Sequence, residues 1–166
     1  MKIAESERLV LREMTPDDVD RLLVIFSDPV AMEHYPSIKT KEETKEWINW
    51  TLGNYKEYGV GLWIVERKDG TFVGQCGIVP QTVDGTTQFE IGYLFVREHW
   101  RKGYATEAAG ACKKYGLEEK GYEKLISLIA PENIASKKVA LNIGMSFEKE
   151  IQKWDRKIEV YSVSIG

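Results

Sequence analysis

The sequence contains few of the residues that build disulfide frameworks and metal sites. It has two cysteines, Cys76 and Cys112, in 166 residues, too few for a disulfide framework and not spaced as metal ligands. Its two histidines, His34 and His99, show no link to a cysteine of the kind a catalytic thiol needs. We therefore expect two free, buried thiols in a reducing compartment and no metal site.

Long apolar runs and an excess of basic residues are also absent. No apolar run approaches ~18 residues, the length that a membrane span needs. The charged N-terminal segment lacks the apolar region of a signal peptide. The net charge of -3 provides no positive field for nucleic acid or an anionic membrane. We expect a cytoplasmic protein without nucleic-acid or membrane partners.

The composition is that of a globular protein, and the length fits a single domain over residues 1–166. Capping boxes at Thr15 and Thr40 start two helices, and alanine-rich and short apolar segments predict two more at 105–120 and 135–143. The expected strands are 8–12, 62–66, 72–79, 87–96, 124–130, 145–153 and 156–165.

This order, β-α-α-β-β-β-α-β-α-β-β, predicts an α/β (α+β) architecture. We expect a central mixed, mostly antiparallel, seven-stranded twisted sheet flanked by about four helices.

The most informative segment is the strand 89–96, the turn 97–103 and the helix start at Tyr104. Gly103 and Ala105 allow the backbone to approach a ligand closely, and a helix N-terminus presents unpaired N–H groups. Together with the helix dipole, this arrangement suits a pyrophosphate, and Arg101 and Lys102 add positive charge at its rim. A tight loop that enters an amphipathic helix and binds nothing is the alternative.

The stretch from Trp100 to Ala105 resembles the pyrophosphate loop of the GNAT acetyltransferases, usually written Gln/Arg-x-x-Gly-x-Gly/Ala. Glu90-Ile91-Gly92-Tyr93, Gly103-Tyr104-Ala105-Thr106-Glu107-Ala108 and Asn133-Ile134-Ala135-Ser136 are similar to the RimJ/RimL branch of that superfamily. The resemblance covers nearly the whole chain, most specifically residues 90–147. Arg101 departs from it, because relatives often have glycine there and a positive φ would strain an arginine.

The resemblance implies an acetyl-CoA-dependent N-acetyltransferase that acts on a primary amine, either a protein N-terminal α-amine or a small molecule. It also implies a monomer or homodimer. Cofactor contacts are implied at three places: the backbone of Phe95 and Val96 for the pantetheine arm, Asn133 for the same arm, and the backbone of the loop for the pyrophosphate. The loop residues are Arg101, Lys102, Gly103, Tyr104, Ala105 and Thr106.

Two residues are candidates for catalysis. Glu90 interrupts an apolar strand, so we expect a carboxylate beside the cofactor with a pKa raised by partial burial, suited to a general base. Its alternative is a surface glutamate on an alternating strand. The resemblance implies Ser136 as the general acid, and its alternative is a helix N-cap. For the whole protein, the alternative to an enzyme is a non-catalytic module that senses acetyl-CoA.

Overall fold

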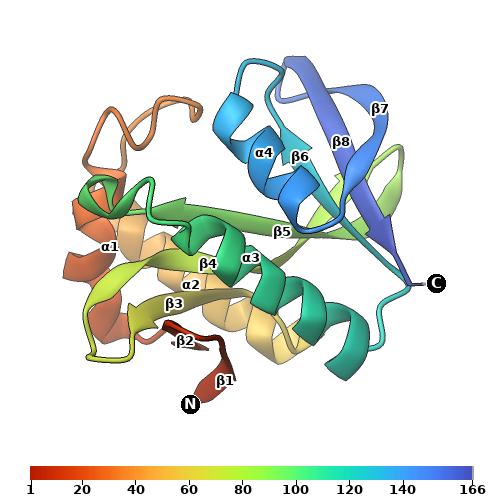
Figure 1. Ribbon diagram of the computed structural model, residues 1–166. Helices are drawn as coiled ribbons and strands as arrows, with labels where there is room; N and C mark the ends of the chain where they lie inside the picture. The colour runs from red at the N-terminus through yellow and green to blue at the C-terminus, as the bar shows by residue number, and fades with distance from the viewer. Residues whose placement is uncertain (166) are drawn as a thin grey trace.

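The computed structural model describes residues 1–165 as one eight-stranded sheet with helices on both faces (Figure 1). The strand order is β1-β2-β3-β4-β5-β6-β8-β7. The helices are α1 (Val19–Phe26), α2 (Lys41–Tyr58), α3 (Tyr104–Lys114) and α4 (Ile134–Asn142). The strands are β1 (Lys2–Glu5), β2 (Leu9–Glu13), β3 (Leu62–Arg67), β4 (Phe72–Val83), β5 (Thr86–Phe95), β6 (Lys124–Ile129), β7 (Ser146–Lys153) and β8 (Arg156–Ser164).

This architecture confirms the expected mixed, mostly antiparallel sheet with four helices. The sheet has eight strands rather than seven because β1 pairs antiparallel with β2. Local patterns do not predict β1, since the strand is four residues long and has charged, exposed ends at Lys2 and Glu5. Within the described residues, β5 and β6 form the parallel pairing of the sheet.

The predicted helix starts are correct, and one predicted helix changes its hydrogen bonding before its end. Capping boxes form at Thr15, before a 3₁₀ turn that leads into α1, and at Thr40, before α2. Helix α3 gives way to π-helical bonding over Tyr115–Glu119, inside the segment expected to be a single α-helix to residue 120.

Strand β4 continues past Pro80, where the sequence predicted it to end. Pro80 pairs with Phe89 of β5, and the register of β4 with β3 begins only at Leu62 and Gly77. Ile78 donates its N–H towards β3, to Gly61 O at 3.1 Å. The Pro80 nitrogen lies two residues further along β4 and faces the same side. No residue of β3 pairs with Pro80, so its missing N–H removes no hydrogen bond between the strands.

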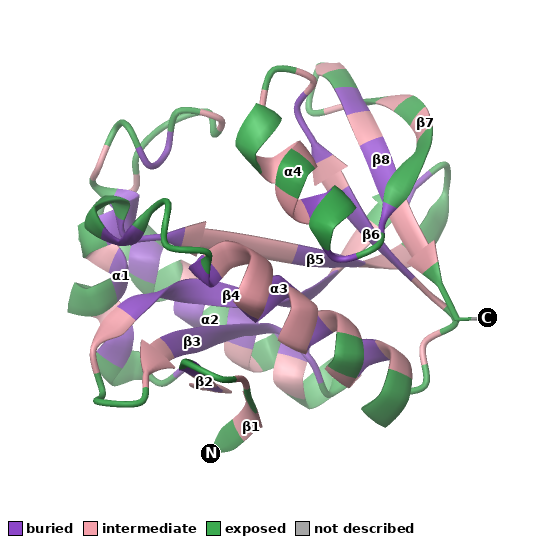
Figure 2. Cartoon of the chain, in the orientation of Figure 1, coloured by how far each residue is buried: buried purple, intermediate pink, exposed green. Residues whose placement is uncertain are grey.

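The two faces of the sheet carry separate cores, visible as buried stretches along the strands in Figure 2. On one face, Ile91 and Phe95 of β5 pack with Ala108 and Cys112 of α3. On the other, Leu94 packs in the cluster that contains buried residues of α1 and α2. Since successive strand residues point to opposite faces, Glu90 and Gly92 share the α1/α2 face with Leu94.

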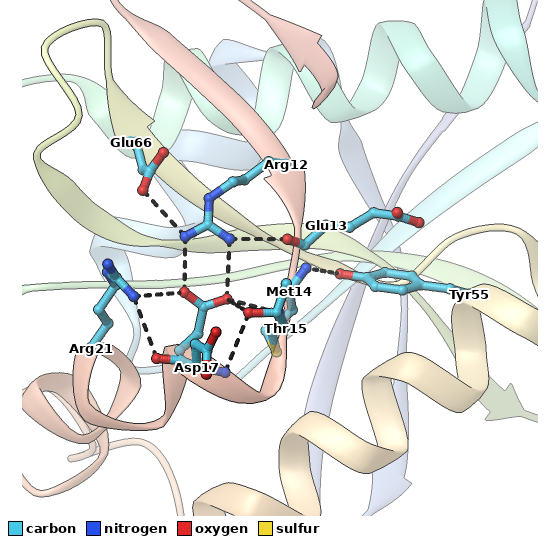
Figure 3. Close-up of polar contacts among 9 residues, drawn as sticks. Arg12, Glu13, Met14, Thr15, Asp17, Arg21, Tyr55 and Glu66 are labelled. Atoms are coloured by element: carbon cyan, nitrogen blue, oxygen red, sulfur yellow. Dashed lines mark hydrogen bonds and ion pairs between the residues drawn. The ribbon is translucent and has the colours of Figure 1, made fainter. Parts of the chain in front are cut away.

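An ionic network around the buried Asp18 fastens β2 to the turn before α1 and to β3 (Figure 3). Arg12 reaches Asp18 at 2.8 Å and Glu66 at 3.2 Å, and the Asp18 side chain is 1% exposed. Burial acts to raise the pKa of Asp18, but hydrogen bonds from Arg12 and from the Thr15 backbone outweigh it and leave that pKa below its usual value. Met14 N–H donates to the Tyr55 hydroxyl at 2.9 Å, which links β2 to α2.

Candidate active site

Strands β5 and β6 part from one another immediately after they meet. Their register contains a single pair, Glu90 with Ile126, and in Figure 1 β6 turns away from the line of β5. Beyond that pair, hydrogen bonds from side chains connect the two strands in place of backbone–backbone hydrogen bonds. Leu128 N–H donates to Glu90 Oε2 at 2.8 Å, and Ser127 Oγ donates to Ile91 O at 2.9 Å. The parting strands therefore have their first freed peptide groups satisfied, and the split is stable without closing.

Glu90 lies at the head of this split, on the α1/α2 face. It is 9% exposed, which rules out the surface-facing alternative. Burial raises its pKa to about 7, against the lowering effect of hydrogen bonds from Leu128 N–H and from Gln81 Nε2 at 3.0 Å. A Cβ placed at Gly92, on the same face, would have no heavy atom within 4 Å. The carboxylate is thus desolvated beside a strand position that leaves space for a reacting group.

Ser136 lies on the opposite face of the sheet, in the first turns of α4. Tyr93 Oη of β5 donates to its Oγ at 3.0 Å, and Ser136 N–H donates to Asn133 Oδ1 at 3.1 Å. Asn133 is therefore the N-cap of α4, and the alternative of Ser136 as a cap is wrong. The hydroxyl of Ser136 contacts Tyr93 of β5, a strand that borders the split, rather than the helix end.

The loop before α3 has the geometry of an anion-binding nest. Gly103 is the N-cap with φ +81°, and Arg101 has φ +66°. The first helical bond runs from Glu107 N–H to Gly103 O at 3.1 Å, so the amides of 104–106 precede the helical ladder. Left-handed backbone alternating with ordinary backbone turns successive N–H groups to one side. Arg101 takes the strained conformation expected where relatives have glycine.

The backbone around Phe95 and Val96 is partly engaged within the protein. Val96 N–H donates to Val73 O, and Val96 O accepts from His99 N–H, each at 2.9 Å. Phe95 O accepts from the Trp100 indole at 3.0 Å. Since peptide groups alternate along a strand, the N–H of Phe95 and the peptide groups of Tyr93 face the split, while the N–H of Val96 faces β4.

Arg8, distant in the sequence, braces the start of α3. Its guanidinium lies 4.6 Å from the Tyr104 ring centre, and its Nε contacts Glu107 Oε1 at 2.7 Å. Glu107 also accepts from the Arg8 backbone N–H at 2.7 Å and from the Ser6 hydroxyl. The N-terminal turn thereby fixes the helix end that carries the nest.

Sequence reasoning missed the residues that hold the site from other elements. Gln81 and Ser127 bind Glu90 and Ile91 from neighbouring strands, and only the strand register reveals them. Tyr35 has 43% of its surface exposed, yet burial of its hydroxyl raises its pKa, and the charge of Glu90 raises it further. No local signal marks Gln81 or Ser127, whereas Tyr35 lies in the loop between the first two helices, which the family resemblance places beside the acceptor.

Among residues 1–165 there is no group of three or more His, Cys, Asp or Glu side chains arranged to hold a metal ion. None of the helices in that range is long and apolar enough to cross a bilayer. Cys76 and Cys112 are both buried free thiols, as expected, with their sulfur atoms 3.5 Å apart in a hydrogen bond and not joined as a disulfide.

Comparison with known proteins places this architecture in a family. Residues 8–146 match the acetyltransferase (GNAT) domain family. The uncharacterized protein YkkB of Bacillus subtilis is 48% identical over 158 residues, which is 94% of this chain and 92% of YkkB. A solved GNAT-family acetyltransferase from Bacillus anthracis is 29% identical with a TM-score of 0.82, covering 99% of this chain and 98% of that one.

The fold is also shared with RimL, a ribosomal alpha-N-protein acetyltransferase solved in complex with coenzyme A. Its TM-score is 0.82 at 14% identity, covering 99% of this chain and 98% of that one. The resemblance to the RimJ/RimL branch is therefore matched at the level of the fold. On the family match and the close relatives together, the chain belongs to the GNAT family of acetyltransferases and is an acyltransferase enzyme.

Proposed function

We propose that this enzyme transfers the acetyl group of acetyl-CoA to a primary amine, with Glu90 as general base and Ser136 as general acid. One observation carries the proposal: a buried carboxylate and a hydroxyl stand on opposite faces of the sheet, at the place where two strands part. A split that joins the two faces lets an acyl donor enter from the α3/α4 side and an amine from the α1/α2 side.

The pKa of Glu90 suits proton removal from an ammonium or amine. With a pKa of about 7, the carboxylate is substantially deprotonated at neutral pH yet still a useful base. Glu90 takes the amine proton directly or through a water, and the amine nitrogen then bonds to the acetyl carbon. Ser136 Oγ donates a proton to the sulfur as the carbon–sulfur bond breaks. Acetyl-CoA supplies the activated acyl group.

We assign the cofactor contacts to peptide groups that the helices and the sheet do not use for their own hydrogen bonds. The amides of Tyr104, Ala105 and Thr106, with the Gly103 turn, receive the pyrophosphate, and Arg101 and Lys102 add charge from exposed positions. For the pantetheine arm, Phe95 N–H and the peptide groups of Tyr93 serve in place of those of Val96. The side-chain amide of Asn133 retains its NH₂ for the same arm. RimL, which shares the fold, was solved with coenzyme A.

The acceptor side is bordered by the segment between α1 and α2. The charge of Glu90 raises the pKa of Tyr35 in that segment, and Asp28 at its start pairs with Arg97 at 3.0 Å, next to the cofactor loop. We propose as acceptor either a peptide α-amine, by analogy with the alpha-N-protein activity in the name of RimL, or a small-molecule amine.

A thiol-release assay tests the proposal. Acetyl-CoA is incubated with a panel consisting of a peptide with N-terminal serine, spermidine and free amino acids, and free coenzyme A is followed over time. Steady release with one panel amine is expected. Ser136→Ala should slow it about 100-fold, the usual range for a general acid. Ser146→Ala, an exposed serine of β7, is the control. Tight binding of acetyl-CoA without turnover would instead support a sensor.

Folding does not complicate the serine variant. Because Asn133 caps α4, alanine at 136 removes no cap and is itself a better helix former. The variant does leave the Tyr93 hydroxyl without its hydrogen-bond partner, which should cost about 1–3 kcal/mol of stability. A large loss of turnover in a protein that stays folded is therefore the expected result for a catalytic hydroxyl.

A further inference from the structure

We propose that Tyr93 is a positioning residue for the acid half of the reaction, which orients the Ser136 hydroxyl and resupplies the proton that Ser136 gives to the departing sulfur. This inference rests on the proposed function, because it assumes that Ser136 is the acid.

The geometry of the pair supports a directed relay. Tyr93 Oη donates to Ser136 Oγ at 3.0 Å, which uses a lone pair of the serine oxygen and leaves the serine O–H free to point into the split. The serine backbone is fixed by Asn133, and the Tyr93 ring is held beside Phe95 with 6.1 Å between ring centres. Tyr93 and Ser136 come from β5 and α4, so their bond spans the two sides of the split.

The chemistry explains why a serine would need this partner. An alcohol alone is a far weaker acid than a thiol, so proton donation to a thiolate leaves a costly alkoxide. A phenol is a stronger acid than an alcohol even where burial raises its pKa, so Tyr93 reduces that cost when it protonates the serine oxygen in the same step. Two protons then move in one direction, from Tyr93 to Ser136 and from Ser136 to sulfur.

The protons balance over one turnover. Glu90 gains the proton that the amine loses, and Tyr93 loses the proton that the sulfur finally gains. Exchange with solvent water returns Glu90 to the carboxylate and Tyr93 to the phenol. Burial raises the pKa of Tyr93, and the charges of Cys76, Tyr35 and Glu90 act in the same direction, whereas the Ser136 hydrogen bond lowers it. The phenol is therefore protonated, as a donor must be, across the working pH range.

A double-mutant cycle tests the relay, with acetyl-CoA and the panel amine that gives the fastest thiol release. Tyr93→Phe keeps the ring and should lower kcat about tenfold, with the dissociation constant for acetyl-CoA within about twofold of the parent value. In the Ser136→Ala background the same substitution should change kcat less than about twofold, because no acid remains to be supplied. Tyr122→Phe, whose ring stacks on Phe89, is the matched control and should leave kcat unchanged.

A proton inventory in mixtures of light and heavy water gives a second readout under single-turnover conditions. The parent enzyme should show a curved dependence from two protons in flight, and Tyr93→Phe a linear one. Three results would each overturn the relay while leaving the proposed function standing. They are a Tyr93→Phe variant with the kcat of the parent, an equal loss of kcat in the parent and Ser136→Ala backgrounds, and a linear proton inventory for the parent enzyme. A parent protein that releases no thiol would overturn both.

Discussion

Replacing Glu90 by glutamine removes a titration that should govern both activity and stability. The side chain is nearly isosteric, and its Oε1 can still accept from Leu128 N–H while Gln81 turns its amide to accept from the new NH₂. We therefore expect Glu90→Gln to fold. Its turnover should fall at least about 100-fold, the usual contribution of a general base.

The stability effect can be worked from the pKa. In the folded protein, burial raises the pKa of Glu90 from 4.5 to about 7. A raised carboxyl pKa means that the folded state holds its proton more tightly than the unfolded state does, so stability is lost as pH rises through that window. At about 1.4 kcal/mol for each pKa unit, the folded parent should lose about 3 kcal/mol between pH 4.5 and a pH well above 7.

Urea unfolding of the parent and of Glu90→Gln from pH 5 to pH 8.5 measures this loss. The difference between the two proteins isolates Glu90, because every other group titrates in both. Relative to the variant, the parent should become less stable with rising pH, and its kcat/KM should rise through about pH 7. A difference that stays constant with pH, or a variant with full turnover, would refute the reasoning.

Three further substitutions probe other parts of the structure. Gly92→Ala meets no heavy atom within 4 Å, so its melting temperature should be unchanged while KM for the acceptor amine rises; an unchanged KM would show that the space is not used. Arg101→Gly relieves a φ of +66° and should raise the free energy of unfolding by about 1 kcal/mol in urea titration, and a lower value would disprove the strain. Arg12→Met strips the buried Asp18 of its main partner and should cost about 3 kcal/mol at pH 7. Because the folded pKa of Asp18 is lowered, that cost should shrink as the pH falls below its usual value of 3.8.

Local signals in the sequence predicted the elements well where the chemistry is local. The capping boxes at Thr15 and Thr40, the glycine before α3 and the alternating strands all depend on neighbours within a few residues. Pro80 misled the strand prediction because the tolerance of a proline depends on whether a partner strand runs beside it, and that is decided by β3, which lies far from Pro80 in the sequence.

The site was predictable in part. The burial of Glu90 followed from its place in an apolar strand, and the strain at Arg101 followed from the family pattern. The hydrogen bonds from Gln81 and Ser127, and the meeting of Tyr93 with Ser136, depend on the strand register and on where α4 packs. Those relations join segments separated by up to 43 residues, and no local pattern encodes them.

The central claim is that the amides before α3 hold a diphosphate and that the β5–β6 split admits the thioester arm. A crystal structure of the protein with acetyl-CoA tests it most directly. We expect pyrophosphate oxygens within hydrogen-bond distance of the amides of Tyr104, Ala105 and Thr106, and the thioester between Glu90 and Ser136. A complex in which acetyl-CoA lies elsewhere, with the split filled by the protein's own side chains, would contradict the account.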